Sequence, residues 1–136
     1  MPSRTARLTI AARILLPLYL LVVAFIVFSP SDDGGSGLHD WLAGLLGEPA
    51  YVAIEFAANI AMFVPFGVLV RLASARLHWW MILTLGLLTT VTIELTQLAL
   101  PSRFSTVSDV IANTLGTAVG LAAVWAVGRR ALTRRG

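Results

Sequence analysis

This chain of 136 residues has no cysteine and few charged residues. Without cysteine it forms no disulfide, thiolate zinc site or iron–sulfur cluster, and it has no cysteine nucleophile. Charged residues make up 12% of the chain and hydrophobic residues 57%, whereas a soluble domain carries about 25% charged residues. The mean hydropathy is +0.84. So few charges cannot cover a globule of this size, and the composition therefore excludes a water-soluble fold.

Familiar catalytic and binding motifs are also missing. The sequence holds no P-loop, no zinc-protease motif and no serine–histidine arrangement at a credible spacing. All ten basic residues are arginines at the ends of apolar segments. Despite an isoelectric point of about 10.6, they form no basic face for nucleic acid, so we expect no nucleic-acid partner.

The sequence is rich instead in long apolar segments. Each is close to the roughly 20 residues that a helix needs to cross about 30 Å of hydrocarbon, whereas barrel strands would be about half as long and alternating. We therefore predict an all-α integral membrane protein, with one domain over residues 1–136 that forms a bundle of four transmembrane helices. Gly116 and Gly120 form a GxxxG step that predicts close helix packing. The helices are predicted over residues of about 10–28, 50–70, 79–100 and 107–127.

The first apolar segment also resembles a signal peptide, because arginines precede it. The only pair of small residues after it is Ser29 and Ser31, on either side of Pro30, and this is a poor cleavage site. We therefore interpret the segment as a helix that stays in the protein.

A linker and a short amphipathic segment follow the first helix. Residues 29–37 contain almost nothing that can be buried and several residues that break helices. From Leu38 onward, apolar residues recur at helical spacing, with His39 and Asp40 on the other side. This pattern predicts a helix over residues of about 38–47 that lies in the outer membrane interface, anchored by Trp41.

The arginines predict how the helices are oriented, because positive charge is retained in the cytoplasm. Four crossings place every arginine except Arg103 on one side, together with both chain ends, so we predict that both termini are cytoplasmic. His39 and His78 then lie on opposite sides, which excludes a two-histidine metal site. We expect neither a metal nor a cofactor. The predicted cytoplasmic arginines are Arg4, Arg7, Arg13, Arg71, Arg76, Arg129, Arg130, Arg134 and Arg135.

Charged and amide side chains interrupt three of the predicted helices. Within each helix the acid and the amide are three or four residues apart, so they share one face. Counted at about 1.5 Å of rise per residue from the outer helix ends, all of them fall in the outer half of the bilayer. We therefore predict one polar cluster that opens outward, with Arg103 in the adjacent outer turn able to reach it. The pairs are Glu55 with Asn59, Glu94 with Gln97, and Asp109 with Asn113.

Simpler interpretations are open for some of these residues. Amides often hydrogen-bond between membrane helices without a further role. Asp109 follows Thr106 at the spacing of a capping box, which fits a helix cap. Glu55 and Glu94 are too deep to cap a helix or to reach the interface, so they are the stronger functional candidates.

Several motifs occur in or between three of the helices: the stretch from Asn59 to Gly67, Glu94-Leu-Thr-Gln97, Arg103, and the stretch from Asp109 to Gly116 followed by Gly120. In this order and spacing, they resemble those of the VanZ-like family across residues of about 55–120. The resemblance implies a small multi-helix membrane protein, and the family's namesake lowers susceptibility to the lipoglycopeptide teicoplanin. Where many members carry further acids before the last aspartate, this chain has Thr106 and Ser108, which weakens any mechanism that needs an acidic pair or a carboxylate metal clamp there. The family's shared polar positions map onto Asn59, Pro65, Glu94, Gln97, Arg103, Asp109 and Asn113.

Three functions fit these features. The first is a cell-envelope protein whose outward polar pocket engages a membrane lipid or a lipid-linked cell-wall component, and so alters antibiotic access or envelope composition. The second is an intramembrane enzyme that acts on a lipid-linked substrate, with Arg103 holding phosphate. Its candidate catalytic acids or bases are Glu94, Glu55 and Asp109. The third is a small transporter, which is less favoured because the chain has only four predicted spans and no internal repeat.

Overall fold

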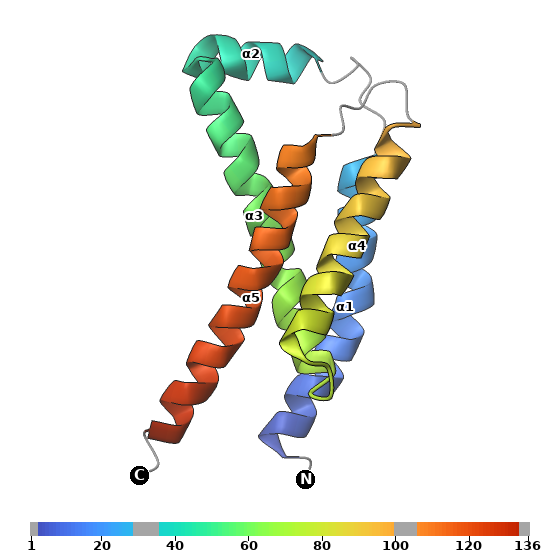
Figure 1. Ribbon diagram of the computed structural model, residues 1–136, viewed down its shortest axis with the longest axis vertical. Coiled ribbons are helices and arrows are strands. Elements are labelled where there is room, and N and C mark those ends of the chain that lie inside the picture. Colours follow the sequence, from blue (N-terminus) through green and yellow to red (C-terminus); the bar gives the residue numbers. More distant parts are fainter. Residues whose placement is uncertain (1–2, 29–35, 100–105, 134–136) are drawn as a thin grey trace.

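The structure, a computed structural model, describes residues 3–28, 36–99 and 106–133, and every regular secondary-structure element in these ranges is a helix (Figure 1). Four of the described helices are long and apolar enough to cross a membrane, which confirms the predicted helical membrane fold. The helices are α1 (Arg4–Phe28), α2 (Ser36–Leu46), α3 (Glu48–Ala73), α4 (Trp79–Gln97) and α5 (Val107–Thr133).

The first and last helices of the chain are longer than the apolar pattern predicts. Helix α1 begins at Arg4 rather than near residue 10, and α5 continues to Thr133 rather than ending near residue 127. Apolar residues mark only the part of a helix that lies in hydrocarbon, whereas backbone hydrogen bonding continues into the polar headgroup region. Arginine is itself a good helix former, so the arginine-rich ends extend both helices.

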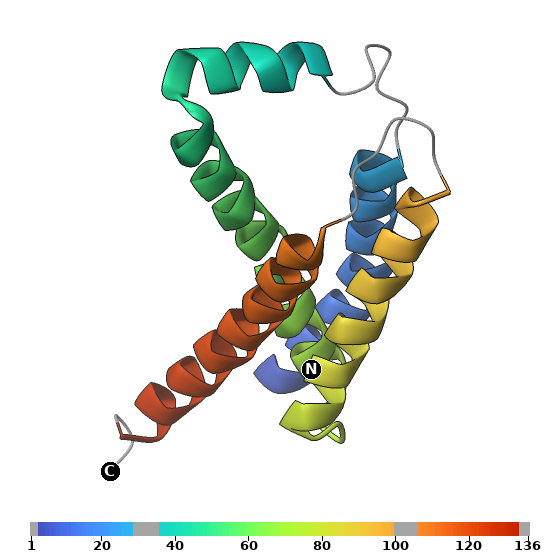
Figure 2. The ribbon, with the colours of Figure 1, turned by 45° about the horizontal axis from the view of Figure 1, so that its top comes forward.

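Helix α2 runs across the end of α3 that lies farthest from the start of α1 and the end of α5 (Figures 1 and 2). Gly47, between α2 and α3, has a φ of 82°, a backbone conformation that glycine adopts without a steric penalty. Pro49 then sits in the first turn of α3, where its missing N–H group costs no helical hydrogen bond. Gly47 and Pro49 thus favour the sharp change of direction between α2 and α3. The location of α2 at a membrane surface stays a prediction.

Helices α3 and α5 share the most extensive contact in the bundle and cross one another (Figures 1 and 2). A Cβ atom on Gly116 would collide with the backbone carbonyl oxygen of Ile60, and one on Gly120 with that of Val64. On the facing helix, a Cβ atom on Gly67 would collide with the carbonyl of Thr117. The predicted role of the GxxxG step in close packing is therefore confirmed.

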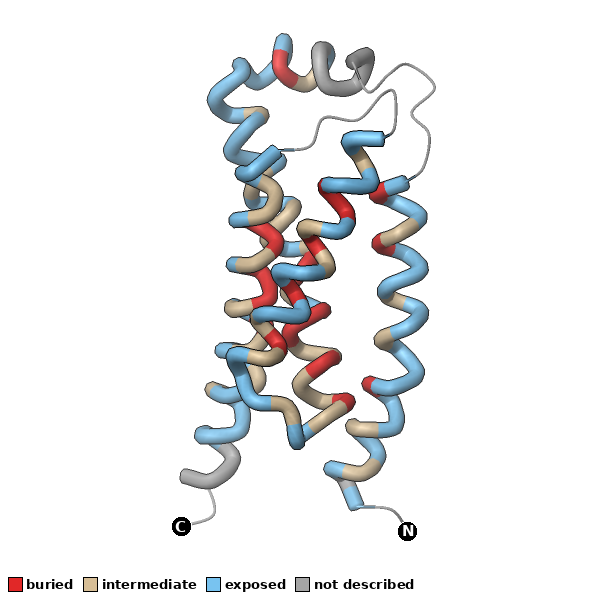
Figure 3. Tube along the Cα trace, turned by 45° about the vertical axis from the view of Figure 1, so that its right-hand side comes forward, coloured by how far each residue is buried: buried red, intermediate tan, exposed pale blue. Residues whose placement is uncertain are grey.

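The remaining helices pack around this crossing. Helix α1 packs mainly on α3, and Tyr19 donates a hydrogen bond to the carbonyl oxygen of Met62 at 2.7 Å. Helix α4 packs on α5 and on α3. Buried positions line the facing sides of the helices and exposed positions the outer sides (Figure 3). The central apolar cluster consists of Val23, Val27, Phe63, Phe66, Val70, Ile82 and Ile93.

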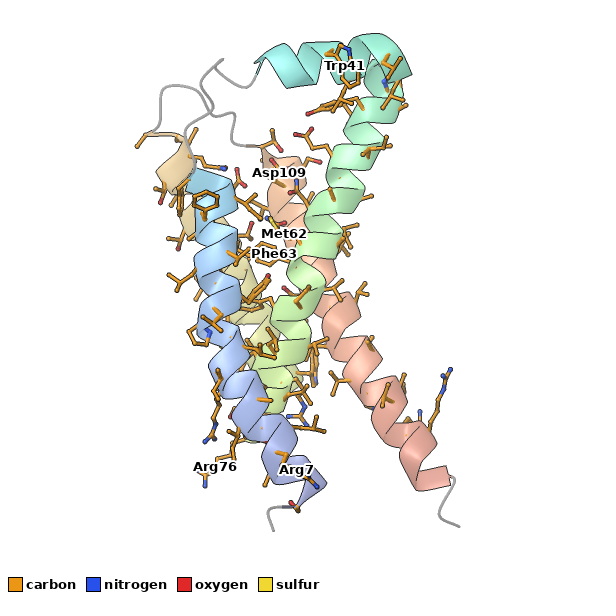
Figure 4. The ribbon with its side chains drawn as sticks, turned by 180° about the vertical axis from the view of Figure 1, so that it is seen from behind. Arg7, Trp41, Met62, Phe63, Arg76 and Asp109 are labelled. Carbon is orange, nitrogen blue, oxygen red and sulfur yellow. The ribbon has the colours of Figure 1, made fainter. Side chains whose placement is uncertain are left out.

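Among the residues that the structure describes, arginines and acidic residues lie toward opposite ends of the bundle. Arg7 and Arg76 lie at the end where α1 begins and α5 finishes, whereas Trp41 and Asp109 lie toward the other end (Figure 4). At the arginine-rich end, Arg13 donates a hydrogen bond from its Nε atom to the carbonyl oxygen of Ala73 at 3.1 Å. The predicted cytoplasmic location of both termini depends on this separation of charge.

Candidate functional site

A stripe of polar residues follows one face of α5. Asp109, Asn113 and Thr117 are spaced four residues apart, which places them one above another on the helix. Asn113 is 2% exposed and Thr117 is 0% exposed. On the adjacent helix α4, Thr90 and Glu94 have the same spacing and are also buried. Burying a polar group without a hydrogen-bond partner is costly. These side chains therefore need partners within the protein.

Asp109 joins α5 to α3. The Nδ2 atom of Asn59 donates a hydrogen bond to Oδ1 of Asp109 at 2.5 Å. The acceptor is a carboxylate, and hydrogen bonds to a charged group are about twice as strong as those between neutral groups. This bond joins the first turn of α5 to the residue of α3 that directly precedes Ile60, the residue that Gly116 meets in the helix crossing.

The second oxygen of Asp109 takes part in a helix cap. The Thr106 hydroxyl donates to Oδ2 of Asp109 at 2.8 Å, and the backbone N–H of Asp109 donates to the Thr106 Oγ1 atom at 3.1 Å. The cap interpretation of Asp109 and its role in an interhelical contact are therefore both correct, because each uses a different carboxylate oxygen.

Glu94 completes this cap from another helix. Its Oε2 atom accepts a hydrogen bond from the backbone N–H of Thr106 at 3.1 Å. In an ordinary capping box, the acid three residues after the cap would accept this N–H, and here that acid is Asp109. Because Glu94 on α4 takes the N–H instead, Asp109 keeps an oxygen for Asn59.

These contacts form one continuous network across three helices. It runs from Glu94 on α4 through Thr106 to Asp109 on α5 and on to Asn59 on α3. We call these four residues the polar network. Both of its carboxylates lie at the N-terminal end of α5, where the partial positive charge of the helix stabilises anions. Glu94 is only 6% exposed, so this arrangement holds a carboxylate in a place that is poor in solvent.

A second polar layer lies one turn deeper. Asn113 donates from Nδ2 to the Thr90 hydroxyl at 2.8 Å, and the Thr117 hydroxyl donates to the carbonyl oxygen of Asn113 at 3.1 Å. The Oδ1 atom of Asn113 is buried and has no hydrogen-bond partner in the part of the chain that the structure describes. An unmet buried acceptor costs about 1–3 kcal/mol, so this oxygen is a ready partner for an N–H or O–H group that enters the site.

The other predicted site residues have different surroundings. Gln97 donates from Nε2 to the carbonyl oxygen of Val27 at 3.4 Å and so links α4 to α1. Glu55 is exposed on α3 and interacts electrostatically with Tyr51, one turn nearer the start of that helix. Arg103 lies outside the residues that the structure describes. Over the part of the chain that the structure describes, hydrogen bonds join Asn59, Glu94 and Asp109 through Thr106, whereas Gln97 bonds to α1 and Glu55 lies near Tyr51.

Threonines of this region take part in the site although they are not among the residues predicted for it. Thr106 bonds to both carboxylates, Thr90 accepts a hydrogen bond from the Asn113 amide, and Thr117 donates to the backbone carbonyl of Asn113 in its own helix. Their spacing was the available signal, because Thr90 precedes Glu94 by four residues and Thr117 follows Asn113 by four. Threonine is common in helices of apolar sequence, where it usually bonds to a carbonyl of its own helix, and so it attracts little notice.

The site offers mainly acceptors. Its two carboxylates and the amide oxygen of Asn113 suit a ligand with ammonium, amide or hydroxyl donors. Among the described residues, no group of three or more His, Cys, Asp or Glu side chains could hold a metal ion. The chemistry within reach of these side chains is hydrogen bonding, charge recognition and proton transfer by a buried carboxyl.

Comparison with known proteins places most of the chain in one group. The family model for VanZ/LLP1 matches residues 16–128. This range contains the whole polar network, the deeper layer around Asn113 and the crossing of α3 with α5. No curated protein and no solved structure matches the chain.

Proposed function

Because the chain belongs to the VanZ/LLP1 family, we propose that it is a cell-envelope protein that modulates susceptibility to glycopeptides such as teicoplanin, or the composition of the envelope. The polar network, which joins three membrane-spanning helices at the end that we predict to face outward, supports this proposal most directly. Scattered structural polar residues would have no reason to connect α3, α4 and α5 at one depth.

The chemistry of the network indicates what it engages. Glu94 and Asp109 present negative charge at the N-terminal end of α5, which favours ammonium, amide or hydroxyl donors on the ligand. Arg103, in the segment between α4 and α5, is the predicted partner for a phosphate. A lipid headgroup or a lipid-linked cell-wall component carries both kinds of group. We propose that such a molecule binds in an outward-facing pocket beside the network.

Expression in a teicoplanin-susceptible Gram-positive host tests this function. We expect the full chain to raise the minimal inhibitory concentration of teicoplanin. Glu94→Gln keeps an oxygen that accepts the Thr106 N–H but removes the charge, and Arg103→Ala removes the predicted phosphate partner. A lost interaction of about 1.4 kcal/mol weakens binding about tenfold, so each variant should abolish most of the increase.

The matched control is Glu48→Gln, which removes an exposed carboxylate near the start of α3, away from the network. It should leave the increase unchanged, provided that all variants reach the membrane in equal amounts. An unchanged inhibitory concentration with the parent chain would contradict the role in resistance. If Glu94→Gln and Arg103→Ala also leave every measured envelope property unchanged, the proposed pocket is wrong as well.

An enzymatic role is the alternative. It is favoured by one observation, that the buried carboxyl of Glu94 and the carboxyl of Asp109 both bond to Thr106. Two carboxyls held this close suit general acid and base catalysis on a lipid-linked substrate. Mass spectrometry of envelope lipids after overexpression would then detect a new or depleted species. An unchanged lipid profile would contradict this alternative and leave the binding function as proposed.

A further inference from the structure

A cavity lies at the opposite end of the bundle from the polar network. It has a volume of about 810 Å³ and lies between the turn that joins α3 to α4 and the second half of α5. No acidic side chain lines it in the described part of the chain. Its polar and aromatic lining consists of Arg71, Arg76, His78, Arg129, Trp79 and Trp125.

Contacts within the protein hold two of these arginines in place. The Nη1 atom of Arg71 donates to the carbonyl oxygens of Ala75 at 3.1 Å and Leu77 at 3.0 Å, which ties the guanidinium to the turn. The guanidinium of Arg129 lies 4.4 Å from the ring centre of Trp125, a cation–π distance. A guanidinium has five N–H donors, so a positioned arginine still suits a phosphate.

The cavity changes from cationic to apolar along the bundle axis. Arg129 lies near the end of α5, whereas Leu121, Ala122 and Val124 line the cavity deeper in the bundle. Leu121 and Arg129 are eight residues apart in the chain, which corresponds to about 12 Å along a helix with about 1.5 Å of rise per residue. A bound molecule would therefore meet positive charge at one end and hydrocarbon at the other.

The location fits a molecule that resides in the membrane. Arg76 lies at the end of the bundle where α1 begins and α5 finishes (Figure 4). Tryptophans such as Trp79 and Trp125 are enriched where the hydrocarbon meets the headgroups, and basic pockets between transmembrane helices bind anionic lipid headgroups. A free phosphate ion would use the arginines but leave the apolar part of the cavity unused.

We propose that this cavity binds an anionic phospholipid. Arg71, Arg76 and Arg129 contact its phosphate, and an acyl chain lies along the apolar surface of α5 near Leu121 and Val124. This lipid site is separate from the polar network at the other end of the bundle, and neither site depends on the other for its occupant.

Native mass spectrometry of the full chain in detergent tests the lipid site. We expect phosphatidylglycerol to form adducts about tenfold more readily than phosphatidylcholine with the same acyl chains, which corresponds to about 1.4 kcal/mol. The double variant Arg76→Gln with Arg129→Gln should lose this preference. The matched control, Arg7→Gln with Arg130→Gln, removes the same charge from positions that do not line the cavity and should keep it.

A second measurement needs no variant. Phosphatidylglycerol with brominated acyl chains should quench the tryptophan fluorescence of the unaltered protein more strongly than brominated phosphatidylcholine does, because Trp79 and Trp125 line the cavity. Inorganic phosphate at millimolar concentration should not reverse the quenching. Equal quenching by the two lipids, equal loss of preference in the two double variants, or full reversal by inorganic phosphate would each overturn the proposal.

Discussion

The amide of Asn59 and the carboxylate of Asp109 connect the two most closely packed helices through a hydrogen bond of 2.5 Å. Their helices touch through glycines deeper in the bundle, at Gly116 and Gly120. The bond therefore holds the first turn of α5 against α3 beside this crossing, since Gly116 meets Ile60, the residue next to Asn59. Since Asp109 also caps α5, a change at this residue affects both the helix and its neighbour.

We predict that Asn59 and Asp109 are energetically coupled. Asn59→Ala and Asp109→Ala should each lower the free energy of unfolding, but the double variant should lose less than the sum of the two. Hydrogen bonds between helices in membranes contribute about 0.6 to 2 kcal/mol, and the charged acceptor favours the upper part of this range. Unfolding of the purified protein by titration with a denaturing detergent measures the coupling. Strictly additive losses would show that the bond contributes nothing.

Glycine-to-alanine substitutions should distinguish the effect of a steric clash at the helix crossing from the general effect of alanine on helix stability. Gly116→Ala places a Cβ atom against the carbonyl oxygen of Ile60, and such overpacking costs about 1–3 kcal/mol. The control, Gly128→Ala on the same helix, adds a Cβ atom that meets nothing within 4 Å and should raise helix stability by about 0.5–1 kcal/mol. Melting temperatures in detergent report both effects. Equal melting temperatures for the two variants would contradict the close crossing.

The role of Glu94 as an acceptor predicts a difference between two substitutions. Glu94→Leu leaves the backbone N–H of Thr106 without its partner, and an unsatisfied donor costs about 1–3 kcal/mol. Glu94→Gln keeps an oxygen at the same position and should cost clearly less. The same detergent titration distinguishes them. A leucine variant as stable as the glutamine variant would show that the hydrogen bond from Thr106 is not needed for stability.

The absence of cysteine makes the orientation directly measurable. Trp41 and Arg76 are exposed and lie toward opposite ends of the bundle, so single cysteines there report on each side. In intact cells, a membrane-impermeant maleimide should label Trp41→Cys, and it should label Arg76→Cys only after the membrane is permeabilised. The reverse pattern would mean that the termini and the arginine-rich end face outward.

Much of this fold follows from the sequence because helix formation and membrane burial depend on local composition. The apolar segments predict α1, α3, α4 and α5, and the step from Gly116 to Gly120 predicts the close crossing. Helix ends are less predictable, since Arg4 and Thr133 lie in polar flanks that hydropathy does not mark. Backbone hydrogen bonds continue there without any apolar pattern.

The site was predictable only in part, because some of its side chains bond to backbone groups of other segments. Helical spacing identifies which side chains share a face, and this brought Asn59 and Asp109 into one predicted cluster. It does not identify backbone partners, whereas Glu94 bonds to the N–H of Thr106 and Gln97 to the carbonyl oxygen of Val27. Those partners depend on how neighbouring helices are placed, which no pattern within a single helix contains.

The most direct test of the proposed function is the teicoplanin susceptibility of cells that express Asp109→Asn. This variant keeps an oxygen for Asn59 and removes the charge at the N-terminal end of α5, so the protein should still fold and reach the membrane. The proposed function predicts that the unaltered chain raises the minimal inhibitory concentration and that Asp109→Asn, at equal abundance, returns it most of the way to that of cells without the protein. An Asp109→Asn variant that protects as well as the unaltered chain would contradict it.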